Sequence, residues 1–411
     1  MRYADQMAAV SFADIQSARV RIAGAVYLSP CPESIPLSEV TGMRLFCKLE
    51  NLQRTGSFKE RGARNALLLL DPTQAERGVI AASAGNHALG LAYHGRLLNI
   101  PVTVVMPRFA PLVKVNTCQR LGANVILYGS SFAEARAQAD AFVVEYGYTY
   151  IHGYAAPAII AGQGTMGLEI LEQVPDVDAI VIPVGGGGLL AGIALAVKTL
   201  RPEVQIIGVE PEGAAKFAAA IVQGAPVQIQ CSPTLADGLA VPDIGANAFA
   251  LASTRLDRLV TVSEDEIALA ILRIVELEKA IVEGSGATGL AACLAGKLPE
   301  LAGKTVVLPF CGGNIDPAIL SRVIEKGLVA DGRICRFSAV ISDRPGGLAG
   351  LTKLVADTGA SIKEIVHERA FTGGDVFAVG VLCTIETRDR SHLEEIFARL
   401  DAEQIPHALA R

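Results

Sequence analysis

The chain has 411 residues and a formal net charge of −6, with 51% apolar and 19% charged residues. This composition excludes a disordered protein. The length predicts two or three domains, at about 100–200 residues per domain. The acidic balance argues against a dedicated nucleic-acid binder, which normally carries a basic stripe. A small-molecule enzyme is therefore the default expectation.

The eight cysteines are scattered, with no CxxC pair and no histidine at zinc spacing. Neither structural zinc nor a disulfide framework is expected. Residues 1–14 contain no apolar run long enough for a signal peptide. Residues 179–197 lack charge over 19 positions, a membrane-like length, but Pro183 and four consecutive glycines favour a strand, a loop and a buried helix. We expect a cytoplasmic protein with no membrane partner.

Between about residues 44 and 330, short apolar runs alternate with helical stretches. The runs are continuous rather than alternating, as is typical of parallel strands that helices cover on both faces. The pattern predicts an α/β fold with ligands at the carboxyl ends of the strands. The clearest runs are residues 79–82, 102–106, 124–127, 179–182, 205–209 and 305–310.

After about Gly332 the pattern changes. Residues 333–341 alternate with period two, and a turn at 343–347 leads to a helix over about 348–358. Strands are expected near 361–370 and 376–386, a second helix near 391–403, and a short last strand. This β-α-β-β-α order is typical of a ferredoxin-like unit. We place a domain boundary near residues 328–333.

A lysine in residues 55–62, Thr-Gly-Ser-Phe-Lys-Glu-Arg-Gly, is the first candidate for chemistry. Ser57 and Glu60 fit a capping box, which predicts that a helix starts there. Lys59 would then lie in the first helical turn, where the dipole lowers the pKa of an amine. A neutral amine is what a Schiff-base lysine needs. The alternative is a solvated surface lysine beside Glu60 and Arg61.

The loop Ser-Ala-Gly-Asn-His at residues 83–87 directly follows an expected strand. Its backbone N–H groups could form a nest for a carboxylate, and Asn86 could bond a ring hydroxyl. The alternative is a turn that caps the next helix through Asn86.

Four glycines at residues 185–188 separate a strand from a helix. They allow the backbone to approach a phosphate at the helix N-terminus. Gly186, Gly188 and Ala191 also satisfy G-x-G-x-x-A, and Glu210 follows about 20 residues later. NAD binding therefore stays open as a rival interpretation.

Cys311, in the segment Phe-Cys-Gly-Gly-Asn after the strand at 305–310, is the fourth candidate. Its thiol could be a weak donor to a ligand nitrogen. A small buried thiol without a function is the commoner case.

Together these segments resemble the serine/threonine dehydratases of the fold-type II (tryptophan synthase β-like) pyridoxal-phosphate (PLP) enzymes, and among them the threonine dehydratases, or threonine ammonia-lyases. The resemblance covers about residues 8–328 and rests on seven ordered motifs. They lie at residues 56–63, 83–88, 161–165, 185–188, 236–238, 283–287 and 311–314. The tail resembles an ACT regulatory domain through Asp-Arg-Pro-Gly at 343–346.

The resemblance implies a catalytic domain over residues 1–330, with two parallel-sheet subdomains, and a ferredoxin-like ACT domain over 332–411. The smaller subdomain, about 50–155, would be a mobile lid over the cofactor. Lys59 would form the Schiff base with PLP, with Phe58 beside the ring. Asn86 would bond the 3′-oxygen, and Cys311 would face the pyridine nitrogen. The phosphate would bind the N–H groups of Gly185, Gly186, Gly187, Gly188 and Leu189.

The implied reaction is β-elimination, in which Lys59 removes the Cα proton and PLP delocalises the charge. L-Threonine would give 2-oxobutanoate and ammonia, and L-serine would give pyruvate. This is a first step towards isoleucine or threonine catabolism. L-Serine or a 3-hydroxyaspartate remains an alternative preferred substrate. An inactive amino-acid sensor working through the ACT domain is the alternative from another class.

The substrate carboxylate would lie at Ser83, Asn86 and His87, and Tyr154 would form part of the wall. A shortage of cations near this pocket favours a methyl group over a second carboxylate. Ala84 stands where serine racemases of the family carry Ser, so racemisation should be weak.

Lys216 stands where metal-binding relatives carry a ligating Asp, so no metal site is expected. A lysine ammonium would take the place of the divalent ion.

The tail is expected to regulate the enzyme by pairing with its copy in a homodimer or homotetramer. Sheet edges invite such pairing. The effector would be isoleucine or valine, held at a helix N-terminus. The alternative is a tail that only stabilises the oligomer. The expected effector loop contains Asp343, Arg344, Gly346 and Gly347.

Overall fold

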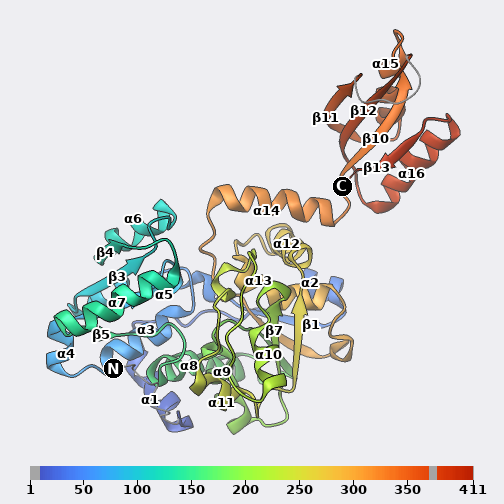
Figure 1. The fold of residues 1–411 in the computed structure, drawn as a ribbon. Coiled ribbons are helices and arrows are strands. Elements are labelled where there is room, and N and C mark those ends of the chain that lie inside the picture. Colours follow the sequence, from blue (N-terminus) through green and yellow to red (C-terminus); the bar gives the residue numbers. More distant parts are fainter. Residues whose placement is uncertain (1–9, 370–376, 411) are drawn as a thin grey trace. The chain divides into compact units, whose positions relative to one another are not determined.

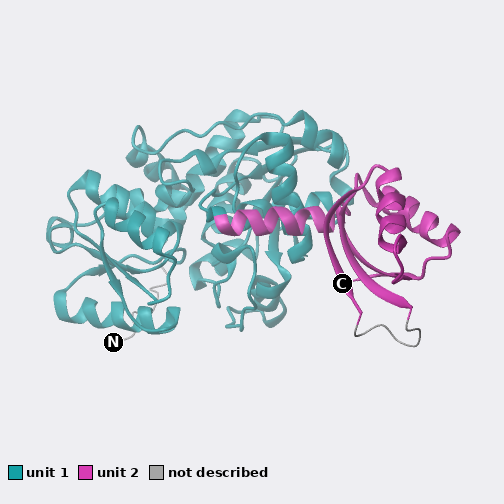
Figure 2. Cartoon of the chain, turned by 90° about the horizontal axis from the view of Figure 1, so that it is seen from above, with its two compact units in different colours: residues 1–317 teal, residues 318–411 magenta. Residues whose placement is uncertain are grey.

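A computed structural model describes residues 10–369 and 377–410. The start of the N-terminal segment assessed above for a signal peptide lies outside these residues. The chain divides into two compact units, residues 1–317 and 318–411 (Figure 2). The division falls at the first residue of helix α14 (Pro317–Ala330), whereas the sequence placed the boundary near residues 328–333, at the end of this helix.

The first unit contains a five-stranded parallel sheet in the order β1-β9-β6-β7-β8; β1 and β7 of this sheet are labelled in Figure 1. Its strands are apolar and mostly buried because helices cover the sheet, except that the edge strand β8 is only partly buried. The strands are β1 (Arg44–Lys48), β6 (Ala179–Pro183), β7 (Gln205–Pro211), β8 (Arg258–Val262) and β9 (Thr305–Pro309). The helices of this part are α1 (Phe12–Ile22), α2 (Ile35–Thr41), α8 (Pro157–Gln173), α9 (Gly188–Leu200), α10 (Lys216–Gln223), α11 (Ala246–Ala252), α12 (Glu264–Arg273) and α13 (Gly284–Leu294).

A second parallel sheet, in the order β4-β3-β2-β5, forms a smaller subdomain of the same unit. Two parallel α/β subdomains are therefore present: the continuous apolar runs predicted the parallel strands, and the family resemblance implied the two subdomains. The strands are β2 (Val79–Ala82), β3 (Val102–Met106), β4 (Asn124–Leu127) and β5 (Thr149–Tyr150). The helices are α3 (Lys59–Leu68), α4 (Pro72–Arg77), α5 (Asn86–Leu98), α6 (Leu112–Arg120) and α7 (Phe132–Tyr146).

The uncharged stretch 179–197 folds as strand β6, a glycine loop and the buried helix α9, as predicted. None of the helices in the described part of the chain combines the length and the apolar character that a membrane span requires. Helices α8 and α9 pack backbone to backbone. A Cβ at Gly192 would lie 2.5 Å from the carbonyl oxygen of Ile160, so this close approach requires glycine.

The second unit contains α14 and a four-stranded antiparallel sheet in the order β11-β12-β10-β13. The predicted alternation in β10 is confirmed: Cys335, Phe337 and Ala339 are buried, while Arg336 and Ser338 are exposed. The predicted strand ends at 370 and 376 lie outside the described residues. The elements are β10 (Ile334–Ser342), α15 (Gly347–Asp357), β11 (Ser361–Glu368), β12 (Ala378–Glu386), α16 (Arg390–Ala402) and β13 (His407–Leu409).

Candidate active site

A cavity of about 580 Å³ lies at the carboxyl ends of strands in both sheets of the first unit. Segments that follow β2, β6 and β9 line it, together with the start of α3. The parallel direction of the strands is what brings these loops together. All candidate catalytic, cofactor and substrate residues line this one cavity: Phe58, Lys59, Ser83, Ala84, Asn86, His87, Tyr154, Gly185, Gly186, Gly187, Gly188, Leu189 and Cys311.

Lys59 is the first residue of α3, and its ammonium lies inside the cavity rather than on the surface. The Nζ atom donates a hydrogen bond of 2.8 Å to the carbonyl oxygen of Gly153 and lies 5.2 Å from the centre of the Phe58 ring. Burial lowers the pKa of Lys59 to about 8, against the raising effects of Cys311 and Glu283. The amine is therefore easier to deprotonate than a surface lysine.

The predicted capping box before this lysine is wrong. The helix has Phe58 as its N-cap, without a side-chain cap, and Ser57 pairs through its backbone with Gly312. The Glu60 carboxylate accepts instead from the backbone N–H of Thr55 and pairs with His94. The helix starts where predicted because the chain turns away from the backbone of the 311–313 segment, not because Ser57 caps it.

The glycine loop between β6 and α9 presents its backbone to the cavity. Gly187 has a φ of +86° and is the N-cap of α9, a conformation that favours glycine. A Cβ at Gly186 would lie 2.1 Å from Cδ2 of Tyr154. The N–H groups of the first turn of a helix have no partner within the helix and attract anions. The loop is thus suited to a phosphate group.

The arrangement around Glu210 does not support the NAD interpretation. A dinucleotide site needs a free carboxylate at this position for the ribose hydroxyls. Here Glu210 is fully buried and accepts hydrogen bonds from the backbone N–H groups of Phe217 and Ala218 at 2.8 and 3.0 Å. Its carboxylate is already used inside the fold, and the fingerprint at residues 186–191 is coincidental.

The loop after β2 supplies backbone N–H groups and a neutral imidazole. Nε2 of His87 donates to the carbonyl oxygen of Ile151 at 2.9 Å. Burial, with a smaller contribution from Lys59, lowers the pKa of His87 to about 3. The ring is therefore neutral, and Nδ1 is an acceptor with no partner among the described residues. A substrate carboxylate would need the N–H groups of this loop rather than the imidazole.

Asn86 belongs to a hydrogen-bond chain that the motifs did not reveal. Its Nδ2 donates to Oε1 of Glu283 at 2.6 Å, and its Oδ1 accepts from Nδ2 of Asn314 at 2.8 Å. Glu283 and Asn314 belong to two of the seven motifs, but their contact with Asn86 depends on how three segments meet. No sequence signal joins them.

Cys311 lies at the cavity wall and is buried. Its Sγ donates to the carbonyl oxygen of Pro309 at 3.3 Å. Burial raises the pKa of Cys311 well above its ordinary value, so the side chain is a neutral thiol. It can offer a ligand nitrogen a weak hydrogen bond but no charge.

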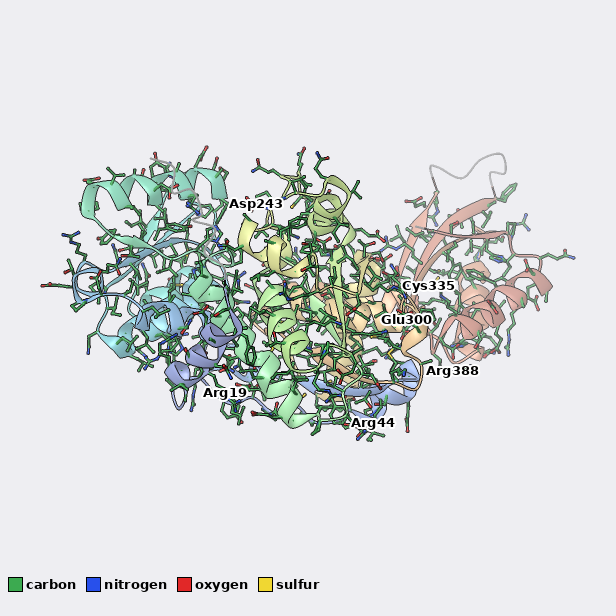
Figure 3. The ribbon with its side chains drawn as sticks, turned by 90° about the horizontal axis from the view of Figure 1, so that it is seen from below. Arg19, Arg44, Asp243, Glu300, Cys335 and Arg388 are labelled. Carbon is green, nitrogen blue, oxygen red and sulfur yellow. The ribbon has the colours of Figure 1, made fainter. Side chains whose placement is uncertain are left out.

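Tyr154 closes the cavity over the glycine loop, and its hydroxyl donates to Asp243 (labelled in Figure 3). The expected shortage of cations is wrong, because Arg136 of α7 also lines the cavity. Its guanidinium pairs with Asp140 at 2.9 Å and lies 3.8 Å from the centre of the Tyr150 ring. Arg136 was missed because it stands in an ordinary helical stretch, outside the motifs.

Known proteins share most of this chain. A curated L-threonine ammonia-lyase from Thermotoga maritima is 43% identical over 94% of this chain and 96% of its own. An L-threonine dehydratase described as catabolic, from Staphylococcus aureus, is 42% identical over 78% of this chain and 94% of its own. The solved structure of processed threonine deaminase isoform 2 from Solanum lycopersicum has a TM-score of 0.73 and 38% identity, covering 77% of this chain and 86% of that one.

A solved serine racemase from maize is also similar, with a TM-score of 0.74 and 34% identity over 78% of this chain and 99% of its own. Residues 22–312 match the family described as pyridoxal-phosphate dependent enzymes. That range contains every residue that lines the cavity. The chain belongs to the family of pyridoxal-phosphate dependent enzymes.

Proposed function

We propose that this protein is a threonine ammonia-lyase, which eliminates water from L-threonine to give 2-oxobutanoate and ammonia and acts on L-serine more slowly. The observation that carries the proposal is the cavity in which Lys59, the glycine loop and Asn86 meet. The relatives named for threonine and serine chemistry support it.

The residues present fit PLP. The glycine loop presents the N–H groups at the start of α9 to the cavity, and such groups attract anions. Ser285 Oγ, also in the cavity wall, is buried without a hydrogen-bond partner in the described structure and remains available to a ligand. Lys59 would hold the cofactor covalently, Asn86 its 3′-oxygen and Cys311 its ring nitrogen. When bound, PLP supplies an electron sink for a carbanion at the substrate Cα.

The chain's own groups would handle the proton and the orientation. Lys59 is the base that removes the Cα proton, and its lowered pKa favours that role near neutral pH. The loop at Ser83–His87 would orient the substrate carboxylate through N–H groups at the start of α5. The neutral thiol of Cys311 brings no charge to the ring nitrogen, which keeps the electron sink mild and favours elimination over longer-lived side reactions.

We expect the highest kcat/KM for L-threonine, then L-serine, then 3-hydroxyaspartate. Tyr154 offers an apolar wall for a methyl group, and the guanidinium of Arg136 in the same cavity wall is already paired with Asp140. Racemisation should be weak because Ala84 provides no acid–base group on the second face. The measurement is steady-state 2-oxo acid formation with each substrate, with D-serine analysed in parallel. A higher kcat/KM for 3-hydroxyaspartate than for threonine would contradict this order.

We expect neither EDTA nor added Mg²⁺ to change the activity by more than about twofold. Lys216 is fully buried, and its Nζ donates to the carbonyl oxygen of Ala214 at 2.8 Å and lies 3.5 Å from Oε1 of Glu210. An ammonium thus fills the oxygen-lined space in which a hard cation would bind. The assay compares rates before and after chelation. A large loss restored by Mg²⁺ would disprove this expectation.

The second unit is proposed to be a ferredoxin-like ACT domain that regulates the enzyme through pairing in a homodimer or homotetramer. Its β-α-β-β-α-β order and antiparallel sheet support this proposal. Val340 and Val366 on the sheet are each 38% exposed, which leaves apolar surface for a second copy. The T. maritima relative matches 94% of this chain, whereas the S. aureus relative matches only 78% of it.

Isoleucine or valine is the proposed effector, because threonine deamination can feed isoleucine synthesis. Gly346 and Gly347 line a cavity of about 590 Å³ at the start of α15. Asp343 and Arg344 lie outside that lining: Asp343 pairs with Arg369 at 3.0 Å, and Arg344 stacks on Phe377. An effector bound in this cavity would therefore contact Gly346 and Gly347 rather than Asp343 and Arg344.

Deleting residues 332–411 should leave PLP binding intact, change the oligomeric state and remove any response to isoleucine or valine. The catalytic cavity is formed entirely by residues of the first unit, so it does not need the tail. Light scattering and initial rates with and without the amino acids test the change. If the full-length enzyme shows no response, and truncation alters neither kinetics nor oligomeric state, the tail has no regulatory role.

We place the protein in the cytoplasm. All eight cysteines are free, and most are buried, which suits a reducing compartment. Fusion to a fluorescent protein would test this location.

A further inference from the structure

Glu283 is a buried carboxylate in the cavity wall that the proposed chemistry does not use. It is 7% exposed and is the N-cap residue of α13, yet its side chain makes no cap hydrogen bond. The carboxylate faces the cavity side instead, where it accepts from Nδ2 of Asn86 and from the backbone N–H of Asn314. A Cβ at Gly312 would lie 2.5 Å from Oε1 of Glu283, so this arrangement also requires a glycine in the next segment.

The surrounding hydrogen bonds determine which way the Asn86 amide points. Nδ2 of Asn314 donates to the carbonyl oxygen of Thr55 at 2.7 Å and to Oδ1 of Asn86 at 2.8 Å. Both N–H groups of Asn314 are then used, so the atom of Asn86 that faces it is the acceptor oxygen. Nδ2 of Asn86 must face Glu283. One of its two N–H groups bonds the carboxylate, and one remains for a ligand.

We propose that Glu283 is a positioning residue for the cofactor: its carboxylate orients and polarises Asn86, whose remaining N–H then bonds the 3′-oxygen of PLP. The inference rests on the proposed role of Asn86. An ionised acceptor makes the stronger hydrogen bond, so the ionised form of Glu283 holds Asn86 more firmly than the protonated form. The 3′-oxygen is part of the conjugated system of the cofactor, so its hydrogen bond affects the absorption of the bound cofactor.

Charged groups from several elements face Glu283. Asp237, in the motif at residues 236–238, raises the pKa of Glu283, and Lys114 of α6 lowers it. These two side chains pair with each other at 3.1 Å, Lys114 from the smaller subdomain and Asp237 from the larger. Lys59 and Cys311 also interact electrostatically with Glu283. Burial is the largest effect and, with Asp237, raises the pKa of Glu283 to about 7.

The sign of the pH effect follows. Below pH about 7 Glu283 is protonated and its hold on Asn86 weakens, and above it the carboxylate is ionised and the hold is strong. The absorption spectrum of the bound cofactor should therefore change with a midpoint near this pH in the wild-type holoenzyme. Glu283→Gln keeps an oxygen acceptor for Asn86 but cannot ionise. We expect it to retain bound PLP and to lose this transition. An unchanged transition in Glu283→Gln would overturn the proposal.

The neighbouring pair gives a second test that does not alter Glu283. Asp237→Asn should shift the midpoint to lower pH, because it removes the carboxylate that disfavours ionisation. Lys114→Met should shift it to higher pH, because it removes the favourable cation. Asp243→Asn, whose partner is Tyr154, is the matched control and should leave the midpoint in place. Shifts of the same sign, or none, would overturn the proposal even if Glu283→Gln fails to fold.

Asn86→Ala separates this inference from the proposed function. If Asn86→Ala leaves the cofactor spectrum and the pH dependence of that spectrum unchanged, Asn86 does not bond the cofactor and the inference about Glu283 is wrong. The proposed function is tested separately, by threonine turnover of the wild type. If Asn86→Ala changes the spectrum and Glu283→Gln does not remove the transition, the inference about Glu283 alone is wrong.

Discussion

Replacing Lys59 by alanine is expected to abolish turnover of L-threonine. In the proposed mechanism one amine would both carry the cofactor and remove the Cα proton, so the substitution would delete two roles at once. Loss of a general base alone lowers rates by about 10²–10⁴-fold, and loss of the covalent link adds to this. The side chain is enclosed by the cavity and bonded to Gly153, and no other lysine lines the cavity in the described structure.

The measurement combines initial rates with borohydride reduction of the holoenzyme. Wild-type protein should retain the cofactor covalently after reduction, and Lys59→Ala should not. Lys304→Ala is the matched control, because Lys304 is exposed and lies outside the cavity. It should behave like the wild type in both assays. Wild-type activity together with a reducible cofactor link in Lys59→Ala would show that another residue holds the cofactor.

Replacing Arg61 by leucine should destabilise the fold by about 3–5 kcal/mol at neutral pH. Arg61 is fully buried on α3, and its guanidinium bonds Glu50 at 2.7 and 2.9 Å and Glu169 at 2.7 Å through two nitrogens. Lys48 donates to Glu169 at 2.6 Å. Removing Arg61 leaves two buried carboxylates with one cation, which is the costly way to break a buried ion-pair network.

The loss of stability in Arg61→Leu should depend on pH, because it depends on the ionisation of Glu50. Burial alone would raise the pKa of Glu50, but the charge and hydrogen bonds of Arg61, together with Lys48 and Ser29, outweigh it, so the pKa of Glu50 is lowered. In the wild type, the ionised Glu50 carboxylate contributes to stability when the pH lies above the pKa that Glu50 has in the unfolded chain. This contribution is lost as the pH falls through the lower pKa that Glu50 has in the folded protein. In Arg61→Leu the carboxylate should prefer its protonated form, so the difference between the two proteins should shrink in acid.

Unfolding in urea, followed by circular dichroism at neutral and mildly acidic pH, provides the measurement. Arg19→Leu is the control: Arg19 (labelled in Figure 3) pairs with Glu172 on the surface, where both side chains are about half exposed. An exposed pair contributes about 0–1 kcal/mol. If Arg61→Leu unfolds no earlier than Arg19→Leu, the buried network does not hold α3 against α8.

Much of the candidate site could be predicted from the sequence because it is built from loops that follow parallel strands. Glycine runs, an Asn-containing turn after a strand and a lysine at the start of a helix are local signals, and parallel strands carry the loops that follow them to one edge. The continuous apolar runs predicted parallel strands, and the alternation in β10 together with the order of elements predicted the antiparallel sheet. These predictions depend on short stretches of chain and on the period of apolar residues.

Local reasoning failed where side chains had several possible partners. Ser57 and Glu60 have the spacing of a capping box, yet Glu60 bonds Thr55 and His94. Arg136 lines the cavity although nothing near it in the sequence marks it. In each case the partner lies on another segment, and spacing along one segment cannot identify it.

The sequence by itself determined the strand–loop–helix order, the glycine loop between β6 and α9, and the position of Lys59 at the start of a helix, because backbone conformation and apolar period are local properties. Only the tertiary structure decided which charges meet. The sequence places Arg61 two residues after Lys59, but only the packing of α3 against α8 encloses it between Glu50 and Glu169. Glu283 belongs to the motif at residues 283–287, but only the fold brings it within hydrogen-bond distance of Asn86. Burial makes these contacts strong, and burial depends on how distant segments pack.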